Sequence, residues 1–599
     1  MCSALIEAKS RFLSPRKLLS KAGFKLKRHG GVICISAIGL IVNLIWIAQF
    51  RVGKLFDIDE AGYLERAIVD GHFLSKSGPI GLYQHLQNGD PQAPLLPVIA
   101  GFFHSIIGGP TTWLFGYTQI FYVILIGSVY ALVLKLKDLK FALIAALTIA
   151  VVPSVLQESR SFQFGLVAAA MMTLALAVQV YAGKFDRWST TLAWGVALGL
   201  ASLSRTMVIG LLPGLLVGAM ITLLSAPRSK IRFVRASAAV IVAFGVAWTW
   251  WGASWRAVFH YLNDYGYGRH SGFYGKPNTV FSLEWWTKRP GHIANELGPL
   301  LTTLLIGVVV ASVFLRLKRR NTDESKAERS HWPSLAQLQR VAQKGWLPVV
   351  VALTWDFFAL SSTRNEGSYF ELTAVPLVVV LSYLAAVAPT RLPRVQLLTA
   401  GSFAACLLVA TSGPWFSIHP SRLSAPLSGP PLFDGRGTLY MYAQNFYKSF
   451  AVANSSKQID RLFRGESDSI NALANEILRI SRNNKQPPFL TMAVEEPFVN
   501  TNTIQLRVLE LTGKEMPVML VKMPGEIGAS IKTQLTSPIY GRPNFVIVGN
   551  NKVLGGDKSF LTLTHPLKII PLLRELGFKR KFSEELLGGQ TYQLWWRGN

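Results

Sequence analysis

Long apolar runs, separated by short polar segments, fill the first two thirds of this chain. Between Gly31 and about Ser412 these runs are about 17 to 25 residues long, the length that an α-helix needs to cross a lipid bilayer. Runs such as residues 165–180 have no polar stripe at helical spacing, which argues against a soluble helical protein. The pattern therefore predicts an all-α polytopic membrane domain over residues 31–413.

The hydrophobic pattern changes after the last predicted span. Residues 414–440 are rich in Pro, Ser and Gly, as linkers are, and residues 441–599 have the mixed pattern of a small α/β domain. Because this domain has neither a Gly-x-Gly-x-x-Gly nor a Walker lysine motif, we expect it to recognise substrate or add stability rather than bind a nucleotide. Its strand-like runs are 489–494, 518–521 and 545–548, and its helical stretches include 504–511 and 566–576.

The chain is strongly basic, with 61 Lys and Arg, 33 Asp and Glu, and a net charge of +28. In a soluble protein this balance would indicate nucleic-acid binding, but here the cations lie in short loops between apolar runs, where they mark the cytoplasmic side. Membrane lipids are therefore an expected partner and nucleic acid is not. The three cysteines, Cys2, Cys34 and Cys406, form no Cys-x-x-Cys pair, which leaves no disulfide framework and no thiolate metal site.

The positive-inside rule orients the predicted helices. Residues 1–30 form a basic cytoplasmic N-terminus, so the first helix runs outward and residues 51–93 form a long external loop. Short loops without large inserts favour the cytoplasmic (inner) membrane of a bacterium. The other segments expected outside are 157–160, 255–296, 361–371 and everything after a last span near 395–413.

One stretch does not fit this alternation. Residues 94–109 and 113–134 look like two spans, yet the basic cluster that begins at Lys135 allows only one crossing after the external loop. Either the segment at Pro94 is a short or re-entrant helix, or the Lys135 cluster breaks the rule. The expected total is about 11 to 13 transmembrane helices.

Three carboxylates follow the first apolar run directly, in the stretch Asp57-Ile58-Asp59-Glu60-Ala61-Gly62-Tyr63. Charge at this place costs stability, so we interpret the stretch as a site that acts on a substrate held at the lipid boundary. Acids also favour helix N-termini, and a solvated helix start is the alternative interpretation. Asp57 and Asp59 are the candidate general bases of this stretch.

Other external segments add cations and aromatic rings to these acids. A carboxylate can take a proton from an acceptor hydroxyl, cations can neutralise a phosphate leaving group, and aromatic faces suit sugars. The combination fits a phosphorylated, lipid-linked sugar. The candidate substrate-binding residues are Asp57, Tyr63, His85, Glu158, Arg160, Tyr265, Arg269, Arg364 and Tyr369.

Several of these candidates have a purely structural alternative. Glu158 and Arg160 could pair with each other across a helix end. The Gly- and Tyr-rich stretch 261–270 could pack on the membrane surface through its aromatic rings. Arg205 lies between two apolar runs, where charge is expensive, but a short external turn would make it ordinary.

The order of these motifs resembles a known group of membrane enzymes. Asp59-Glu60-Ala-Gly-Tyr63 after the first helix, Ala93-Pro94-Leu95 at the start of the next segment, and Arg160 before a long apolar helix are similar to the glycosyltransferase family 39-like enzymes. These include the protein O-mannosyltransferases and the aminoarabinose transferase of lipid A. The resemblance covers roughly residues 31–400. It implies the GT-C membrane fold, a polyprenyl-phosphate sugar donor, and Asp59 as catalytic base with Glu60 positioning donor or acceptor.

Two departures from the family pattern affect the expected site. Members often have a Lys before the Pro-Pro-Leu that opens the second helix, where it contacts the lipid phosphate, whereas this chain has Gln92-Ala93-Pro94-Leu95. The second acid, usually a few residues after the loop-two arginine, is missing, with Gln163 near that place and Glu158 as the nearby carboxylate. The candidates for the phosphate contact are Arg160, Arg269 and Arg364.

The sequence leaves a metal requirement open, and no cofactor is assigned with certainty. Asp59, Glu158 and a histidine such as His85 could form an oxygen and nitrogen site for a divalent metal ion. Nothing in their spacing requires one.

Two classes of function remain. We expect a membrane glycosyltransferase that moves a sugar from a polyprenyl-phosphate donor to a protein, glycan or lipid acceptor on the extracytoplasmic face, with inversion at the anomeric carbon. The alternative is a transporter or flippase of a lipid-linked saccharide, which needs charges near the bilayer midplane and often has inverted repeats. The charges cluster in external loops and we find no internal repeat, which favours the enzyme.

Overall fold

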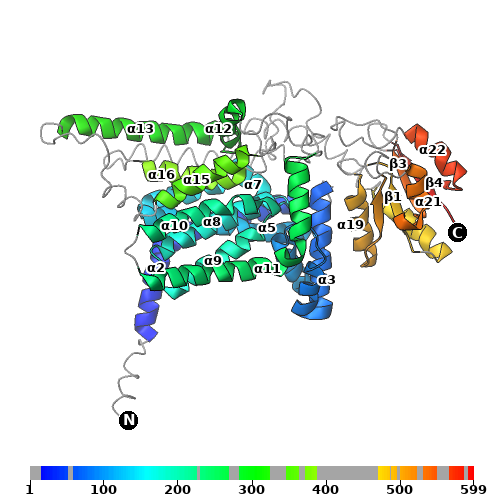
Figure 1. Cartoon of the computed structure of the whole chain (residues 1–599), viewed down its shortest axis with the longest axis horizontal. Coiled ribbons are helices and arrows are strands. Elements are labelled where there is room, and N and C mark those ends of the chain that lie inside the picture. The colour runs from blue at the N-terminus through cyan, green and yellow to red at the C-terminus, as the bar shows by residue number, and fades with distance from the viewer. Residues whose placement is uncertain are drawn as a thin grey trace, which may run out of the picture.

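The computed structural model describes a bundle of long helices with a separate mixed α/β domain at one end (Figure 1). The bundle helices lie roughly along one direction, whereas α3 (Ile58–Leu86) runs across the end that faces the α/β domain. The described residues are 15–50, 58–225, 229–268, 282–297, 299–323, 346–362, 371–386, 470–485, 487–494, 499–521, 530–549, 566–585 and 591–598.

The bundle has the apolar helices of an integral membrane protein. Within the described ranges, five helices are long and apolar enough to cross a membrane: His29–Ala48, Thr111–Leu136, Phe164–Ala182, Thr206–Leu224 and Lys230–Gly266. Five shorter apolar helices accompany them: Leu95–Ile107, Leu139–Val151, Leu301–Phe314, Trp346–Ser361 and Ala374–Ala385. The prediction of a polytopic helical domain is confirmed, while the expected span near 395–413 lies outside the described residues.

The helices follow the apolar runs of the sequence closely. The segments are α2 (Pro15–Phe50), α4 (Leu95–Ile107), η1 (Thr111–Trp113), α5 (Leu114–Leu136), α6 (Leu139–Val151), α7 (Pro153–Ser159), α8 (Phe164–Ala182), α9 (Trp188–Ser202), η2 (Thr206–Gly210), α10 (Leu212–Leu224), α11 (Lys230–Gly266), α12 (Leu283–Leu297), α13 (Pro299–Asp323), α15 (Trp346–Ser361), η4 (Glu371–Thr373) and α16 (Ala374–Ala385).

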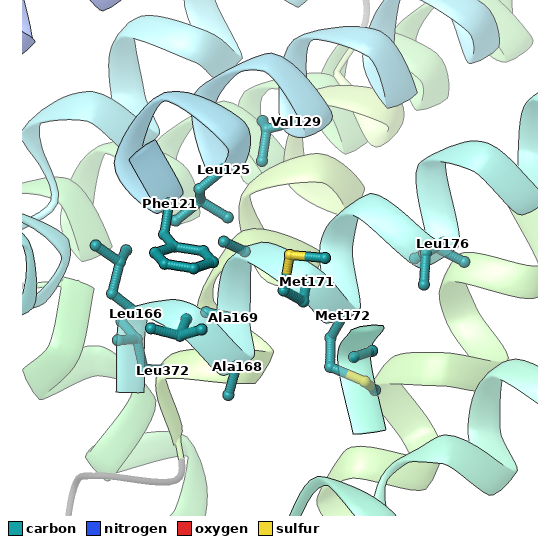
Figure 2. Packing of buried hydrophobic residues seen from close by; sticks show 14 of the residues in the cluster. Phe121, Leu125, Val129, Leu166, Ala168, Ala169, Met171, Met172, Leu176 and Leu372 are labelled. Carbon is teal, nitrogen blue, oxygen red and sulfur yellow. The ribbon is translucent and has the colours of Figure 1, made fainter. Parts of the chain in front are cut away.

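The centre of the bundle is packed by α5 and α8. Phe121, Leu125 and Val129 are four residues apart, so they form one face of α5 and lie toward α8 (Figure 2). On α8 almost every side chain is buried, including the consecutive Ala168, Ala169 and their neighbours. A helix that is apolar all round can be buried all round, which explains why α8 has no polar stripe.

The helix α4 is short for a membrane span. Its 13 residues rise about 20 Å, which is less than the roughly 30 Å of a hydrocarbon core, so it is too short to cross alone. It packs tightly on α3 at a contact between two glycines. A Cβ added at Gly71 of α3 would lie only 2.6 Å from the carbonyl oxygen of Gly101 in α4. This length agrees with the alternative of a short helix at Pro94, and the number of crossings stays a prediction.

The α/β domain is built on a five-stranded mixed sheet of order β2-β1-β3-β5-β4. The three strand-like runs seen in the sequence form its parallel part, and a C-terminal hairpin extends it with antiparallel pairing. Its strands are β1 (Leu490–Met492), β2 (Val518–Leu520), β3 (Phe545–Gly549), β4 (Lys579–Glu585) and β5 (Thr591–Trp596), and its helices include α19 (Thr501–Thr512), α21 (Ile531–Thr536) and α22 (Pro566–Glu575).

Helix α19 joins this domain to the membrane domain by packing on α3 (Figure 1). Leu506 of α19 is buried in the hydrophobic core of the membrane domain rather than in its own. Nearer to the start of α3, a Cβ added at Gly62 would lie 2.9 Å from Nδ2 of Asn502. The α/β domain therefore contacts the first turns of α3, where the carboxylates predicted to be catalytic lie.

Candidate active site

The first turn of α3 holds the two acids predicted to be catalytic, Asp59 and Glu60. Glu60 is buried, and its Oε1 accepts a hydrogen bond of 3.1 Å from the backbone N–H of Phe162. Asp59, one residue earlier, is exposed. Adjacent residues of one helix thus have different surroundings, with Glu60 fixed to the protein and Asp59 accessible from outside.

Asp59 is accessible, yet many protein atoms surround its carboxyl group. This desolvation raises the pKa of Asp59 above its ordinary value, and the negative charge of Glu60 adds to the increase. The positive charge of Arg205 acts in the opposite direction, which places a guanidinium within electrostatic reach of Asp59. Arg205 lies between α9 and η2, so the fold brings together two residues that are far apart in the sequence.

Glu158 belongs to the same group of charges. It lies in the last turn of the short helix α7 (Pro153–Ser159) and is buried, and this burial is the main reason that its pKa is raised to about 7. Arg205 lowers this pKa and Glu60 raises it, and backbone N–H groups of Gly165 and Leu166 at the start of α8 also lower it. Asp59, Glu60, Glu158 and Arg205 therefore form one electrostatic unit, which we call the acidic cluster.

Arg160 lies two residues after Glu158, but its side chain contacts α2, the first membrane helix. Its Nε donates a 2.9 Å hydrogen bond to Oδ1 of Asn43 in α2, and its guanidinium lies 4.7 Å from the ring centre of Trp46. Burial lowers the pKa of Arg160 to about 10, which leaves it positively charged at neutral pH. The side chain that sequence analysis offered as a phosphate ligand thus also connects the α7–α8 turn to the first helix.

Two of the three aromatic candidates, Tyr63 and Tyr265, are described, and they lie in different places. Tyr63, one turn after Asp59, packs on Phe164 with ring centres 4.2 Å apart, so it connects α3 to the start of α8. Tyr265 lies near the end of α11, where its ring is 4.6 Å from that of Tyr261. The remaining candidates, Asp57, Arg269, Arg364 and Tyr369, lie outside the described residues.

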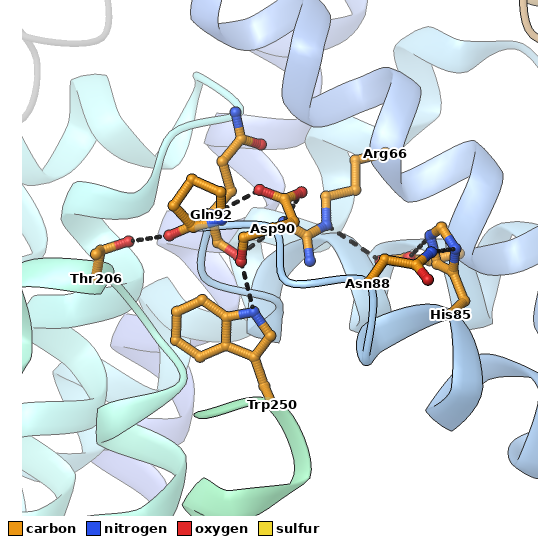
Figure 3. A network of polar contacts seen from close by, with 9 residues as sticks. Arg66, His85, Asn88, Asp90, Gln92, Thr206 and Trp250 are labelled. Carbon is orange, nitrogen blue, oxygen red and sulfur yellow. Dashed lines mark hydrogen bonds and ion pairs between the residues drawn. The ribbon is translucent and has the colours of Figure 1, made fainter. Parts of the chain in front are cut away.

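His85 is held in a polar network on the later turns of α3 (Figure 3). Its Nε2 lies 3.3 Å from Oδ1 of the buried Asp70, and its ring stacks on Phe73 at 4.2 Å. These contacts give the imidazole a structural role within α3. They also engage it away from Asp59 and Glu158, with which the sequence suggested it could share a metal ion.

The same network fixes the chain just before α4. Arg66 donates 2.7 Å hydrogen bonds to Oδ2 of Asp90 and to the carbonyl oxygen of Gln92. Trp250 donates its indole N–H to the carbonyl of Asp90 at 3.1 Å, and Thr206 donates to the carbonyl of Pro91 at 2.8 Å (Figure 3). Since Thr206 follows Arg205, this network also helps to position the cation of the acidic cluster.

The described side chains do not build a metal centre. Across the residues that the structure describes, no group of three or more His, Cys, Asp or Glu side chains is arranged to hold a metal ion. The acidic cluster has three acids, but its charges are balanced by Arg205 and by backbone N–H groups. We therefore derive no chemistry from a metal at this site.

Glu65 marks the contact between α3 and the α/β domain. Desolvation raises its pKa to about 8, and the negative charge of Glu515 in the α/β domain raises it further, while a hydrogen bond from Gln505 of α19 lowers it. A carboxyl group with so high a pKa holds a proton at neutral pH. Docking of the two domains is therefore linked to proton uptake.

Replacing Glu65 with Gln is expected to stabilise this contact above pH 8 and to remove most of its pH dependence. In the wild type the docked Glu65 keeps a proton that a free carboxyl releases, so the contact loses stability as the pH rises from about 4.5 to about 8. The neutral amide avoids this loss, which is on the order of 5 kcal/mol at pH 9. Hydrogen exchange of the α19 amides at pH 5 and pH 9 measures the effect.

Glu510→Gln is the matched control, because Glu510 pairs with Arg507 on α19 itself at 2.8 Å. Its hydrogen-exchange profile should keep the pH dependence of the wild type. If Glu65→Gln also keeps it, Glu65 does not carry the linked proton.

One cation and two amides of this region were not chosen as candidate site residues from the sequence. For Arg205 the sequence left two interpretations open, an ordinary residue at an external turn or a costly charge between two apolar runs, and the second was the signal that pointed to it. Asn43 and Gln119 are polar residues inside apolar runs, and both are buried. Nothing in their local sequence indicates that they meet Ser159 and Arg160.

Comparisons with known proteins agree with this geometry. Residues 91–251 match the family described as dolichyl-phosphate-mannose-protein mannosyltransferase. A comparison with curated protein sequences found no match. Among solved structures, the chain is similar to ArnT from Cupriavidus metallidurans bound to undecaprenyl phosphate, with a TM-score of 0.53 and 13% identity over 94% of this chain and 98% of ArnT. The apo form of that ArnT gives a TM-score of 0.52 and 14% identity over the same shares of the two chains.

At such low identity the solved structures establish the fold. The expected architecture of a helical membrane domain with a small C-terminal α/β domain is confirmed. The chain thus has the fold of ArnT, and its residues 91–251 match the family of dolichyl-phosphate-mannose-protein mannosyltransferases.

Proposed function

We propose that this enzyme transfers a sugar from a polyprenyl-phosphate donor to an acceptor hydroxyl, with Asp59 as the general base. The observation that carries the proposal is the placement of an exposed carboxylate, Asp59, within electrostatic reach of Arg205 and beside the buried Glu60. A general base works best when its pKa approaches the operating pH. The raised pKa of Asp59 fits that requirement.

In the proposed reaction the acceptor oxygen attacks the anomeric carbon while its proton passes to Asp59. The new bond joins the acceptor oxygen to that carbon, and the bond from the carbon to the phosphate oxygen breaks, so polyprenyl phosphate leaves with the electron pair. Attack opposite the leaving group inverts the anomeric configuration. Arg205 would stabilise the negative charge that develops on the phosphate.

Arg205 offers a replacement for the lysine that family members often carry before their second helix. That segment has Gln92 and Ala93 here, and the network around Asp90 holds it beside η2, which follows Arg205. One related protein, the ArnT of Cupriavidus metallidurans, has been solved with undecaprenyl phosphate bound. A polyprenyl phosphate is therefore the leaving group that we propose for this chain.

Glu60 and Glu158 have supporting roles in this proposal. Glu60 is buried and bonded to the backbone of Phe162, so it holds the first turn of α3 and contributes negative charge next to Asp59. Glu158 lies before Arg160 rather than after it, yet shares Arg205 with Asp59. It is suited to take the part of the second acid that the family pattern would place later.

The location of the reaction follows from the same arrangement. We propose that α3, the acidic cluster and the α/β domain lie on the extracytoplasmic side of a bacterial cytoplasmic membrane, because a basic N-terminal segment precedes the first span. The residue ranges 1–30, 31–413, 414–440 and 441–599 remain our proposed division of the chain. The acceptor is a protein, glycan or lipid with a free hydroxyl.

Purified protein supplied with polyprenyl-phosphate sugars of several kinds tests the proposal. We expect release of polyprenyl phosphate together with a new glycosidic bond on an added acceptor. Proteoliposomes with a fluorescent donor in one leaflet test the competing flippase function. Movement of the donor between leaflets without any bond cleavage would favour transport and refute the transferase proposal.

A further inference from the structure

The first membrane helix contains a fully buried amide that contacts three other side chains. Asn43 has no exposed surface, and its Nδ2 donates to Oε1 of Gln119 at 3.1 Å and to Oγ of Ser159 at 2.9 Å. Its Oδ1 accepts the 2.9 Å hydrogen bond from Nε of Arg160. Both hydrogens and the oxygen of this amide are thus engaged, although the residue lies in the span His29–Ala48.

Side chains of helix α5 also form hydrogen bonds with the turn that contains Ser159. Thr118 donates its hydroxyl to the carbonyl oxygen of Ser159 at 2.6 Å, and the amide of Gln119 donates to this same carbonyl. Both side chains are buried. The backbone and the side chain of Ser159 are therefore fixed by two transmembrane helices, α2 and α5, and we call the side chains of Asn43 and Gln119 the amide clamp.

The clamped turn carries the contacts of the acidic cluster. Glu158 directly precedes Ser159, and Phe162, three residues after Ser159, donates its backbone N–H to Glu60 at 3.1 Å. A shift of the turn would therefore move Glu158 and the backbone donor of Glu60 together. Asp59 interacts electrostatically with Glu60, and Arg205 interacts with Asp59 and Glu158, so both would then face a different charge distribution.

Buried amide side chains such as those of the amide clamp are unusual inside membrane-spanning helices. A buried amide in a membrane span costs free energy unless every polar atom finds a partner, and apolar side chains of similar size would pack these helices as well. Hydrogen bonds between membrane helices add only modest stability on average. Holding a catalytic turn in one geometry is a reason for the clamp that packing alone does not supply.

We propose that Asn43 and Gln119 are positioning residues that hold the turn 158–162 so that Glu60 and Glu158 face Asp59 and Arg205 in the geometry needed for sugar transfer. This inference rests on the proposed function. It adds two residues that touch neither donor nor acceptor and act through Ser159, Arg160 and Phe162.

The test compares Asn43→Leu and Gln119→Leu with wild type. Leu has nearly the size of Asn or Gln but makes no hydrogen bond, so Asn43→Leu should lower kcat about 100-fold, as small misplacements of catalytic groups do, with little change in KM for the donor. Gln119→Leu should have a smaller effect of the same kind, because Asn43 keeps its contacts with Ser159 and Arg160. Ser128→Ala is the control, since the Ser128 hydroxyl, also buried on α5, bonds only to its own helix at Ile124.

A second readout separates positioning from mere helix packing. Dicyclohexylcarbodiimide modifies protonated buried carboxyl groups, and mass spectrometry locates the products on Glu60 and Glu158. In Asn43→Leu the pH dependence of modification at Glu158 should shift from that of wild type, whereas in Ser128→Ala it should not. If Asn43→Leu does not fold, Gln119→Leu provides both measurements.

Wild-type kcat and an unchanged modification profile in a folded clamp variant would overturn the inference. So would a loss of kcat without a change in the modification profile, because that result assigns the clamp another role. If wild-type protein transfers no sugar from any donor, the proposed function fails, but the modification profile still reports whether the clamp positions the two acids.

Discussion

Asp59→Asn is expected to lower kcat for sugar transfer by about 10²- to 10⁴-fold while KM for the donor changes little. Asn has the size of Asp and keeps a hydrogen-bonding side chain, but it cannot accept the proton of the acceptor hydroxyl. Because Asp59 is exposed and sits on the first turn of α3, the change removes no buried contact of the core. Steady-state kinetics with a polyprenyl-phosphate sugar measures the effect.

Asp138→Asn is the matched control for this experiment. Asp138 is an exposed acid at the start of α6, where its side chain accepts a 3.0 Å hydrogen bond from the backbone N–H of Phe141. Asn caps helices as well as Asp does, so this variant should behave like wild type. Equal kcat for Asp59→Asn and Asp138→Asn would remove Asp59 from the proposed mechanism.

The fold was predictable to the extent that it depends on local hydrophobic pattern. Membrane spans such as 164–182 are apolar on every side, and three strand-like runs became the parallel part of the α/β sheet. The hairpin of β4 and β5 was missed because its first strand, Lys579–Glu585, is mostly charged. Its place in the sheet comes from pairing with β5, which no local pattern indicates.

The candidate site could be predicted only where a short stretch of sequence contains reactive groups whose charge costs stability at that position. Asp59 and Glu60 were recognised because carboxylates beside a membrane span are expensive. The sequence left the role of Arg205 open, since its relation to Asp59 depends on the packing of α9 against α11 and of α11 against α3 and not on spacing. Conversely, His85 looked like a ligand in a polar stretch, but the fold pairs it with Asp70.

The lysine that the family pattern places before the second helix is absent from this chain, and the structure shows which cations lie nearby. Without the usual lysine, the segment before α4 has no cation of its own, and the network from Arg66 to Trp250 is occupied in holding that segment in place. Arg205 reaches the acidic cluster from the far end of α9. In our proposal Arg205 takes the place of the cation that is missing before α4, and the second prediction tests this role.

Arg205→Gln is expected to lower kcat by about 10²- to 10³-fold, the usual effect of removing one group that stabilises transition-state charge. It should also move the acid limb of the pH–rate profile to higher pH. The charge of Arg205 lowers the pKa of both Asp59 and Glu158, so its removal raises both values. Since a general base acts in its ionised form, a higher pH is then needed to reach full activity.

Two further variants make this result specific. Arg205→Lys keeps the charge but not the planar guanidinium, so the pH–rate profile should stay close to wild type while kcat recovers only in part. Arg187→Gln removes an exposed cation from the opposite end of α9 and should leave both quantities unchanged. An Arg205→Gln enzyme with a wild-type pH–rate profile would show that this guanidinium does not set the ionisation of the acidic cluster, and the phosphate would then require a different cation.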